Sequence, residues 1–478
     1  MNTHHAAGDP RRWLALPVLL TGAFLPPLDF FIVNVALPSI RASLKASSAE
    51  LQFVISAYAA TYAVFLITGG RLGDLYGRRR MFLFGISAFT LASLLCGLAG
   101  SPQMLLAGRM LQGMAAAALA PQVLASIRVM FPLAEQSRAL GLYAATFGMA
   151  ATLGQLLGGA LISGHWWGLG WQLIFLVNLP VGLAALIGGI CLLRESHAAH
   201  ALKLDLGGVA LLSMALGLLV YPLVEGREQH WPAWTFVMLA ASLAMFALFV
   251  RYEARIANRG GSPLIDVQLF REGDFSLGIL ITLGFYLTSA FVLTYAVYMQ
   301  SGLQRNAMQT GLATLPFTLG YFFGSVLASR LIGAWGHRTL PISCTLQAIG
   351  FAMVAATVLQ RLPHDLLVPG LVVAGLGFGI AMPALIRVVI SSVDAQHAGL
   401  ASGMVITALQ ISAALGVAII GGIFYSALRG QETSGAYAHA FATSLSCNVG
   451  ALVVITLLSL ALGRTSQAAV SATAVPLD

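Results

Sequence analysis

Charged side chains are scarce in this sequence. Asp, Glu, Lys and Arg account for 9% of its 478 residues, whereas a soluble protein of this length carries about 25%. Hydrophobic residues account for 58%, and they gather in runs of about 20 residues, each long enough to cross about 30 Å of hydrocarbon. The composition therefore excludes an ordinary soluble protein and predicts an all-α polytopic membrane protein embedded in a lipid bilayer.

Cysteine and the usual motifs of catalysis are also scarce. The four cysteines fall in predicted helices with no paired spacing, so neither a disulfide framework nor a metal site is expected. We find no nucleotide-binding loop, no His-rich cluster and no Ser/His/Asp set within one loop, and the loops are too short for a catalytic domain. The sequence therefore predicts neither an enzyme nor a bound cofactor.

Fourteen membrane spans are predicted when the sequence is divided at its clusters of charged residues, Pro and Gly. They cover roughly residues 14–36, 51–70, 82–100, 103–125, 139–162, 172–193, 205–224, 232–251, 275–298, 309–332, 340–359, 366–389, 400–426 and 441–463. With the N-terminus inside, 18 Lys and Arg residues fall on the cytoplasmic side, 6 on the outer side and Arg109 within a span. Because cytoplasmic loops carry the excess of positive charge, we expect both termini in the cytoplasm. The net charge of +8 then requires no acidic partner and no nucleic acid.

An internal repeat indicates how these spans are organised. The segment GGRLGDLYGRRR at 69–80 aligns without gaps with ASRLIGAWGHRT at 328–339, each copy following the second helix of a predicted six-helix unit. Duplicated units are typical of transporters with a substrate site near the midplane, between the halves. The predicted organisation is a cytoplasmic N-terminus (1–13), a six-helix half (14–193), a linker with two extra helices (194–274), a second six-helix half (275–463) and a cytoplasmic tail (464–478).

One carboxylate lies inside the first span, in the stretch PPLDFFIVNVALP at 26–38. A charge at the centre of a membrane helix costs roughly 2.5–3.5 kcal/mol on insertion scales, so it usually marks a pathway for ions or substrate. Pro26 and Pro27 lack amide hydrogens and should bend the helix just before Asp29. Asp29 is either a structural carboxylate that bonds a neighbouring helix, or a site that binds a proton or another cation.

Arg109 is the natural partner of Asp29. At 1.5 Å per residue, both side chains lie about 8–10 Å below the outer end of their spans, so a pair is geometrically possible. A nearby guanidinium stabilises the ionised carboxylate, whereas burial stabilises the protonated form. The pair is therefore either a proton switch, in which the balance changes as the site opens to one side and then the other, or a static pair that fixes helix packing.

Two glycine-containing motifs accompany the pair. The first follows the second span and contributes Gly70, Arg71, Gly73, Asp74, Gly77, Arg78 and Arg79. Its arginines either anchor the loop at the cytoplasmic surface or form a latch between the halves, and Asp74 can lie at a helix N-terminus or pair with an arginine. The second motif, in the fifth span, contributes Gly154, Gln155, Gly158 and Gly159. Its small residues predict close helix packing, with an amide that needs a partner.

In this order, the motifs resemble the major facilitator superfamily, specifically its fourteen-helix drug:proton antiporter family (the second such family). LDFFIVNVALP is similar to the family's first-helix signature, although Phe31 replaces the usual Thr. RMLQGMAAAALAP at 109–121 resembles the fourth-helix motif, and GQLLGG at 154–159 the fifth-helix antiporter motif, with Gln155 in place of Pro. Similar stretches are WQLIFLVNLPVGL at 171–183, in which Gln172 stands where Arg is common, YMQSGLQRNAMQTGLATLP at 298–316 and LASGMVITALQISAALGVAI at 400–419.

The resemblance implies a major facilitator fold and a monomeric transporter in a bacterial inner membrane that exports hydrophobic or amphipathic compounds in exchange for protons. The residues it implies for coupling and substrate are Asp29, Arg109, Gln112 and Asn34, and those for the cavity are Phe30, Phe31, Gln300 and Gln410. The proton gradient replaces any cofactor. Two alternatives remain open: transport, outward or inward, of one endogenous metabolite or natural product, and operation with a periplasmic adaptor and an outer-membrane channel.

Overall fold

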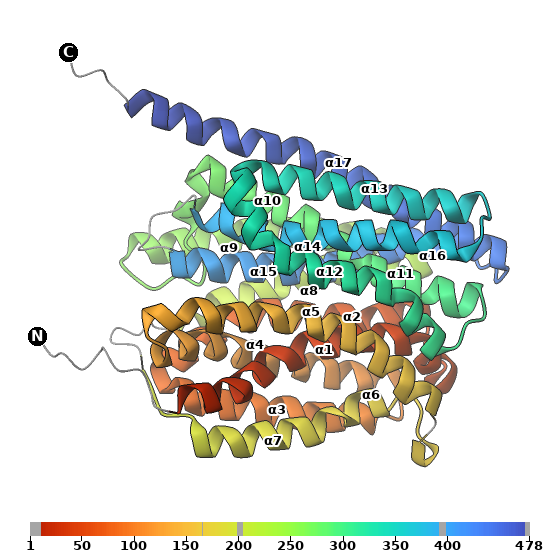
Figure 1. Cartoon of the computed structure of the whole chain (residues 1–478), viewed down its shortest axis with the longest axis horizontal. Helices are drawn as coiled ribbons and strands as arrows, with labels where there is room; N and C mark the ends of the chain where they lie inside the picture. The colour runs from red at the N-terminus through yellow and green to blue at the C-terminus, as the bar shows by residue number, and fades with distance from the viewer. Residues whose placement is uncertain (1–10, 165, 198–203, 392–397, 474–478) are drawn as a thin grey trace, which may run out of the picture.

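The computed structural model describes residues 11–164, 166–197, 204–391 and 398–473, and within these ranges the regular structure is entirely helical. The long helices lie side by side along one direction (Figure 1), and fourteen segments are long and apolar enough to cross a membrane. The start of α1 and the end of α17 lie at the same end of the bundle, which we call the terminal end; the opposite end is the distal end. This architecture confirms the predicted all-α membrane fold.

The first six spans comprise seven helices. Their bounds are α1 Arg12–Leu44, α2 Ser48–Tyr76, α3 Arg78–Gly97, α4 Pro102–Met130, α5 Leu133–Gly164, α6 Leu173–Leu176 and α7 Asn178–Leu192, the last two forming one span. The extra hairpin follows as α8 (Leu206–Glu228) and α9 (Ala233–Asn258).

The remaining six spans are more often interrupted. Their elements are α10 Gly273–Leu287, η4 Thr288–Ala290, α11 Phe291–Val297, η5 Tyr298–Gly302, α12 Ala307–Trp335, α13 Thr339–Leu359, α14 Leu367–Ser391, α15 Ala398–Gly416, η8 Val417–Gly421, α16 Gly422–Leu428 and α17 Ser434–Thr473. The ninth span runs from α10 to η5, and the thirteenth from α15 to α16. The segments η5 and η8 are π-helical turns, both near the distal end.

Most helices are longer than the predicted spans. Helix α1 continues to Leu44, and α17 begins at Ser434 and runs to Thr473, into the segment expected to be a tail. Hydropathy detects only the part of a helix that hydrocarbon surrounds, whereas polar caps end the helix itself. At the start of α2, for example, Ser47 and Glu50 form a reciprocal capping box.

The repeated motif is mostly helical rather than a loop. Helix α2 continues through it to Tyr76, and α3 begins at Arg78, so Gly77 alone breaks the chain, with φ at +104°. In the second copy α12 ends at Trp335, and Gly336 has φ at +54°. Glycine adopts this left-handed region without the steric cost that a side chain carries. The aromatic–Gly pair of the repeat therefore places the same helix break in both copies.

Two seams join the N-terminal helices to the C-terminal ones. At one seam α5 lies between α1 and α12. A side chain on Gly159 would collide with the backbone of Ala307 and Met308, and one on Gly154 with that of Leu28. At the other seam α2 packs against α15. Small residues allow this close approach of helix backbones, as predicted for the fifth span.

The start of α1 is anchored to the start of α5. Arg12 donates two hydrogen bonds to Glu135, at 2.7 and 2.8 Å, and the indole of Trp13 donates a third at 2.9 Å. The Trp13 ring meets Phe131 edge-on, with ring centroids 5.1 Å apart, and the Arg138 guanidinium lies 4.9 Å from the Trp13 centroid. The hydrogen bond from Arg12 holds the pKa of the Glu135 carboxyl below its ordinary value.

This anchor predicts a stability difference that depends on pH. Because the pKa of Glu135 is lower in the folded protein, its contribution is present at neutral pH and disappears as the pH falls through the folded-state value. We expect Glu135→Gln to lower the melting temperature at pH 7, and the two proteins to converge once the pH falls below the lowered folded-state pKa of Glu135. Thermal unfolding in detergent measures this, with the exposed Glu432→Gln as control. A constant difference down to low pH would contradict the predicted role of the charge.

Candidate functional site

Asp29 is fully buried and ionically paired with Arg109. Arg109 Nη1 donates to Asp29 Oδ2. The other carboxylate oxygen, Oδ1, accepts hydrogen bonds from Gln112 Nε2 at 3.2 Å and from Asn178 Nδ2 at 3.0 Å. The contact expected from matched depths along two helices is therefore present. Both carboxylate oxygens have donors, which removes most of the cost of burying the charge.

Arg109 is held in place from several sides. Its Nε donates to the carbonyl of Val54 at 2.9 Å, and its Nη1 to Gln112 Oε1 at 2.8 Å. The guanidinium carbon lies 4.2 Å from the centroid of the Tyr58 ring and 5.9 Å from that of Phe175. An aromatic face attracts a cation most strongly where water is absent. The guanidinium thus has little freedom unless α2 or α6 moves.

Ser93 on α3 completes the network. Its hydroxyl accepts from Gln112 at 2.8 Å and from Asn178 at 3.2 Å, and the thiol of Cys96 donates to Gln112 Oε1 at 3.4 Å. The Tyr58 hydroxyl donates to the carbonyl of Pro26 at 3.0 Å, one turn before the carboxylate. Side chains from α1, α2, α3, α4 and α7 therefore converge on one charge pair.

Four side chains of this network, Ser93, Cys96, Asn178 and Tyr58, were not among the site residues predicted from the sequence. Asn178 lies in the stretch WQLIFLVNLPVGL, where an amide among apolar residues is itself a signal, because such a group needs a buried partner. Ser93 and Tyr58 gave no comparable signal. Serines and tyrosines occur throughout the spans, and nothing in the sequence indicates which of them face Asp29.

Asn34 does not join the network. Its side chain is buried, but its amide donates to the carbonyl of Phe30 at 2.8 Å, one turn earlier on the same helix. The neighbouring Gln155 donates to the carbonyl of Phe31 at 3.2 Å, which gives the amide of the fifth-span motif its partner on α1. Of the four predicted coupling residues, the structure thus brings Asp29, Arg109 and Gln112 together and leaves Asn34 apart.

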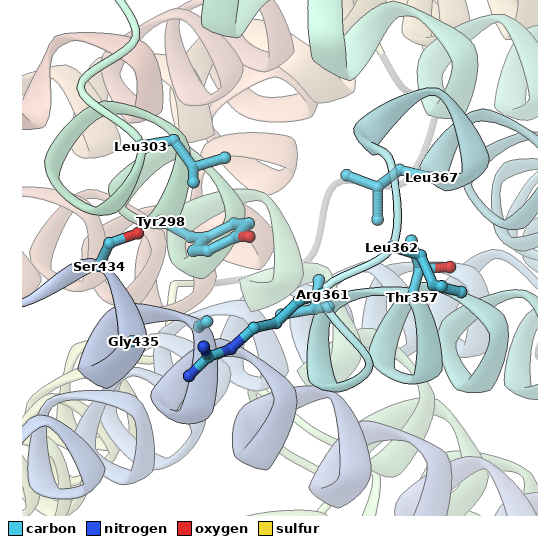
Figure 2. A pocket seen from close by; sticks show the side chains of 10 residues that line it. Tyr298, Leu303, Thr357, Arg361, Leu362, Leu367, Ser434 and Gly435 are labelled. Carbon is cyan, nitrogen blue, oxygen red and sulfur yellow. The ribbon is translucent and has the colours of Figure 1, made fainter.

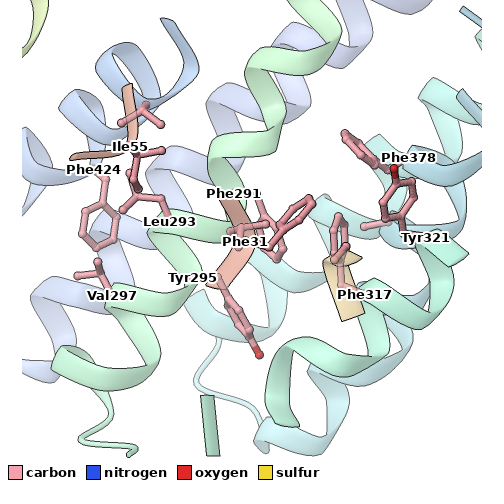
Figure 3. Packing of buried hydrophobic residues seen from close by; sticks show 14 of the residues in the cluster. Phe31, Ile55, Phe291, Leu293, Tyr295, Val297, Phe317, Tyr321, Phe378 and Phe424 are labelled. Atoms are coloured by element: carbon pink, nitrogen blue, oxygen red, sulfur yellow. The ribbon is translucent and has the colours of Figure 1, made fainter. Parts of the chain in front are cut away.

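Phe31 faces a cluster of rings from the C-terminal helices, shown in Figure 3. The ring of Phe31 meets that of Phe30 edge-on at 5.5 Å. Beyond it, Phe291 lies 5.0 Å from Phe317, and Tyr321 lies 5.2 Å from Phe378. One side of α1 therefore carries Asp29 and its charged partner, and the side that carries Phe31 is aromatic.

The other predicted cavity residues lie at the seams. Gln300, in the π-helical turn η5, donates to the carbonyl of Val35 on α1 at 2.8 Å. Gln410 is half-buried on α15, the helix that packs against α2. Among the described residues, no three His, Cys, Asp or Glu side chains gather as metal ligands would.

A pocket of about 320 Å³ opens at the distal end (Figure 2). None of the predicted site residues lines it. Its lining comes from the ends of the C-terminal helices: Tyr298, Leu303, Thr357, Val358, Arg361, Leu362, Leu367, Ser434, Gly435 and Ala438.

The motif at the terminal end makes its own set of contacts. Asp74 pairs with Arg78 at 3.1 Å, which settles the two alternatives for this carboxylate in favour of an arginine partner. The guanidinium of Arg71 donates to the carbonyls of Ser262, at 2.9 Å, and Pro263. Gly70 lies against Pro121, and Gly73 against Gln122 of α4, so α2 and α4 approach each other closely at this motif.

Glu195 caps the start of α3 from the segment after α7. Its carboxylate accepts the backbone N–H groups of Arg79 at 3.0 Å and Arg80 at 3.2 Å, and the Arg79 guanidinium donates to the carbonyl of Ile190 at 2.9 Å. A carboxylate at a helix N-terminus is favoured by the exposed backbone donors there. The bonds of Glu195, like those of Arg71, join the motif to the linker predicted at 194–274 and not to the second half, so the latch between halves stays a prediction.

Comparison with known proteins places this geometry in context. The profile of the Major Facilitator Superfamily matches residues 19–417 and 275–469. A probable actinorhodin transporter of Streptomyces coelicolor is 38% identical over 90% of this chain and 76% of its own length. A puromycin resistance protein of Streptomyces alboniger is 36% identical over 86% and 82%, and the multidrug resistance protein Stp of Mycobacterium tuberculosis is 36% identical over 84% and 74%.

Solved structures share the fold. A bacterial homologue of the human lysosomal transporter Spinster, in an inward-facing conformation, superposes with a TM-score of 0.68 at 17% identity, covering 96% of this chain and 98% of its own. A D-xylose–proton symporter gives 0.66 at 13% identity, over 93% and 96%. Fold, spans and sequence relatives agree, and the chain belongs to the Major Facilitator Superfamily of membrane transporters.

Proposed function

We propose that this protein exports hydrophobic or amphipathic compounds across a bacterial cytoplasmic membrane in exchange for protons. The observation that carries the proposal is the buried ion pair of Asp29 and Arg109. The amides of Gln112 and Asn178 donate to the carboxylate, so a protonation of Asp29 would change several helix contacts at once. Relatives at 36–38% identity bear the names of antibiotic transport or resistance proteins, which supports export.

The exchange follows from the hydrogen bonds of Asp29. A proton that reaches the carboxylate removes its negative charge, so Arg109 loses its ionic partner and the amides of Gln112 and Asn178 lose an anionic acceptor. The bonds that hold α1, α4 and α7 together then weaken, the helices shift and cargo is released outside. Release of the proton from Asp29 into the cytoplasm restores the ion pair with Arg109, and the cycle repeats.

The driving force is sufficient for useful accumulation. One elementary charge that crosses 100 mV yields about 2.3 kcal/mol, and tenfold in concentration costs about 1.4 kcal/mol. One proton exchanged for each uncharged cargo molecule therefore supports a gradient of about fifty-fold from voltage alone. Transport of this kind does not require the protein to modify the cargo chemically. We therefore propose that the chain is not an enzyme.

We propose that the aromatic cluster opposite the charge pair becomes the cargo surface when the two halves separate. In this structure the rings of Phe31, Phe291, Phe317 and Phe378 are buried against one another, and they are apolar and polarisable with few hydrogen-bonding groups nearby (Figure 3). Such a surface selects by shape and hydrophobicity rather than by a particular functional group. The position that resembles a family threonine carries Phe31, which extends this apolar surface.

A narrower function, export of one natural product, is the second candidate. Two of the relatives are named for a single antibiotic, actinorhodin or puromycin. A susceptibility panel on cells that express this protein separates the two. Protection against several unrelated amphipathic compounds supports the broad function, and protection against one chemical class supports the narrow one.

The charge distribution supports both termini in the cytoplasm, as the counts of 18 and 6 basic residues predict. In this orientation the terminal end faces the cytoplasm, and Asp29 lies near the middle of α1, which is longer than the predicted span. We propose that the protein works as a monomer with a proton and a small molecule as its only obligatory partners, whether or not an adaptor and outer channel join it.

Asp29→Asn tests the coupling directly. The amide keeps the shape of the carboxylate but cannot bind and release a proton, so we expect proton exchange to fall to that of empty liposomes. The measurement is the lumenal pH of proteoliposomes after addition of a lipophilic cation. The exposed Asp365→Asn is the matched control and should exchange protons normally. If Asp29→Asn exchanges protons at the wild-type rate, Asp29 is not the coupling site.

Asn178→Leu tests the part of the network that sequence reasoning missed. Leucine has a similar volume but cannot donate to Asp29 or Ser93. A hydrogen bond to a charged group contributes about 1.5–3 kcal/mol, so we expect the transport rate to fall at least about tenfold. Asn258→Leu, at an exposed position on α9, is the control. A wild-type rate in Asn178→Leu, with the protein folded, would remove Asn178 from the mechanism.

A further inference from the structure

A second pair of carboxyl groups is buried at the terminal end, in the extra hairpin. Asp205 immediately precedes α8, and Glu253 lies on the last turns of α9. Asp205 is 6% exposed and Glu253 is 0% exposed. Neither group belongs to the network around Asp29, and the transport cycle described above does not use them.

Backbone donors hold both carboxyl groups. Asp205 Oδ1 accepts the N–H of Gly208 at 2.8 Å and the hydroxyl of Tyr252 at 3.2 Å, and its Oδ2 accepts the N–H of Leu264 at 3.1 Å. Glu253 Oε2 accepts the N–H of Ile265 at 3.0 Å. The segment that leads from the hairpin to the ninth span is thus fastened to both ends of the hairpin.

One oxygen of this pair has no donor. Among the described residues, no protein N–H or O–H reaches Glu253 Oε1, although the atom is buried. It lies beside Asp205 Oδ2, since a side chain on Gly208 would collide with both atoms, and the two carboxyl groups interact directly. Two ionised carboxylates cannot hydrogen-bond each other, whereas a protonated and an ionised one can. A proton on Glu253 Oε1 would let this oxygen donate to Asp205 Oδ2 and so give it the partner that it lacks.

The surrounding charges favour the same arrangement. Arg71 of the repeated motif is 6% exposed and interacts electrostatically with Asp205 and Glu253. Two carboxylates and one guanidinium would leave a buried net charge of one, and a single proton cancels it. Burial strongly disfavours an uncompensated charge.

Other charged groups nearby are directed elsewhere. Asp74, one turn beyond Arg71, pairs with Arg78. On α9, Arg251, Arg255 and Arg259 are exposed. Among the residues that the structure describes, which exclude 198–203, Tyr252 also lies against the pair and donates to Asp205.

We propose that Asp205 and Glu253 form a second buried proton site that carries one shared proton, and that the position of Arg71 controls how tightly this proton is held. Arg71 also donates to the carbonyls of Ser262 and Pro263, so it binds the same segment to which the two carboxyl groups are hydrogen-bonded. A shift of the repeated motif that withdraws Arg71 leaves the site one charge more negative, and the site then holds its proton more tightly. By linkage, loss of the proton draws Arg71 inward by the same free energy.

Infrared spectroscopy of the purified protein in lipid nanodiscs tests this without any transport. Ordinary carboxyl groups are ionised well below pH 7, so a protonated carboxyl band at pH 7 reports a special site. We expect such a band in the Asp29→Asn protein, which removes the other buried acid. We expect it to vanish in Asp29→Asn combined with Glu253→Gln, or with Asp205→Asn, because either change leaves one carboxylate to balance Arg71.

Two further variants separate a proton site from a structural contact. In the same background, Arg71→Gln should let the protonated carboxyl band persist to a pH about one unit higher, since the positive charge that favours the ionised form is removed. The exposed Glu272→Gln should leave the band unchanged. A spectrum without the band at pH 7, or a band that survives both Glu253→Gln and Asp205→Asn, overturns the proposal. Because Asp29 is absent throughout, failure here leaves the proposed function intact, and the reverse also holds.

Discussion

The requirement that a charge in hydrocarbon must have a partner organises the N-terminal half of this protein. Asp29 and Arg109 pair with each other, Gln112 and Asn178 donate to the second carboxylate oxygen, and the Val54 carbonyl accepts Arg109 Nε, while Arg109 Nη2 has no partner among the described residues. Each partner comes from a different helix or a different turn, so the helices cannot rotate independently. The same bonds that stabilise this arrangement depend on the protonation state of one carboxylate, and stability and switching thus share one set of contacts.

The two halves solve their packing problems differently. The N-terminal half buries a polar network, whereas the C-terminal half buries a cluster of aromatic rings, with Phe291 in contact with Phe317 and Phe351. Aromatic contacts tolerate sliding better than hydrogen bonds, which are lost over a few tenths of an ångström. Glycine seams such as that at Gly159 let the halves touch through backbone rather than long side chains. The N-terminal half is therefore held by directional hydrogen bonds, and the C-terminal half by aromatic contacts that tolerate small shifts.

Much of the fold could be predicted from the sequence because hydropathy and helix rise are nearly independent of context. Spans emerge from composition, and matched depth was enough to pair Asp29 with Arg109. Helix rotation was not predictable, since a helix that is apolar all round has no polar face to orient it, and Ser93 and Tyr58 were therefore missed. Asp205 and Glu253 were missed for another reason: charged residues served as boundaries of spans, so a buried acid near a helix end was read as a mark of the surface.

The π-helical turns η5 and η8 give the distal end a mechanical property of its own. Each turn holds one residue more than an α-helical turn would, and η5 carries Gln300, whose amide bonds Val35 on α1. If such a turn moves along its helix, every side chain it passes rotates by about 100°. A rotation of this size would swing Gln300 off α1 while the remainder of the span keeps its place. The extra residue of a π-helical turn thus lets part of a span rotate about the helix axis while the helix stays continuous.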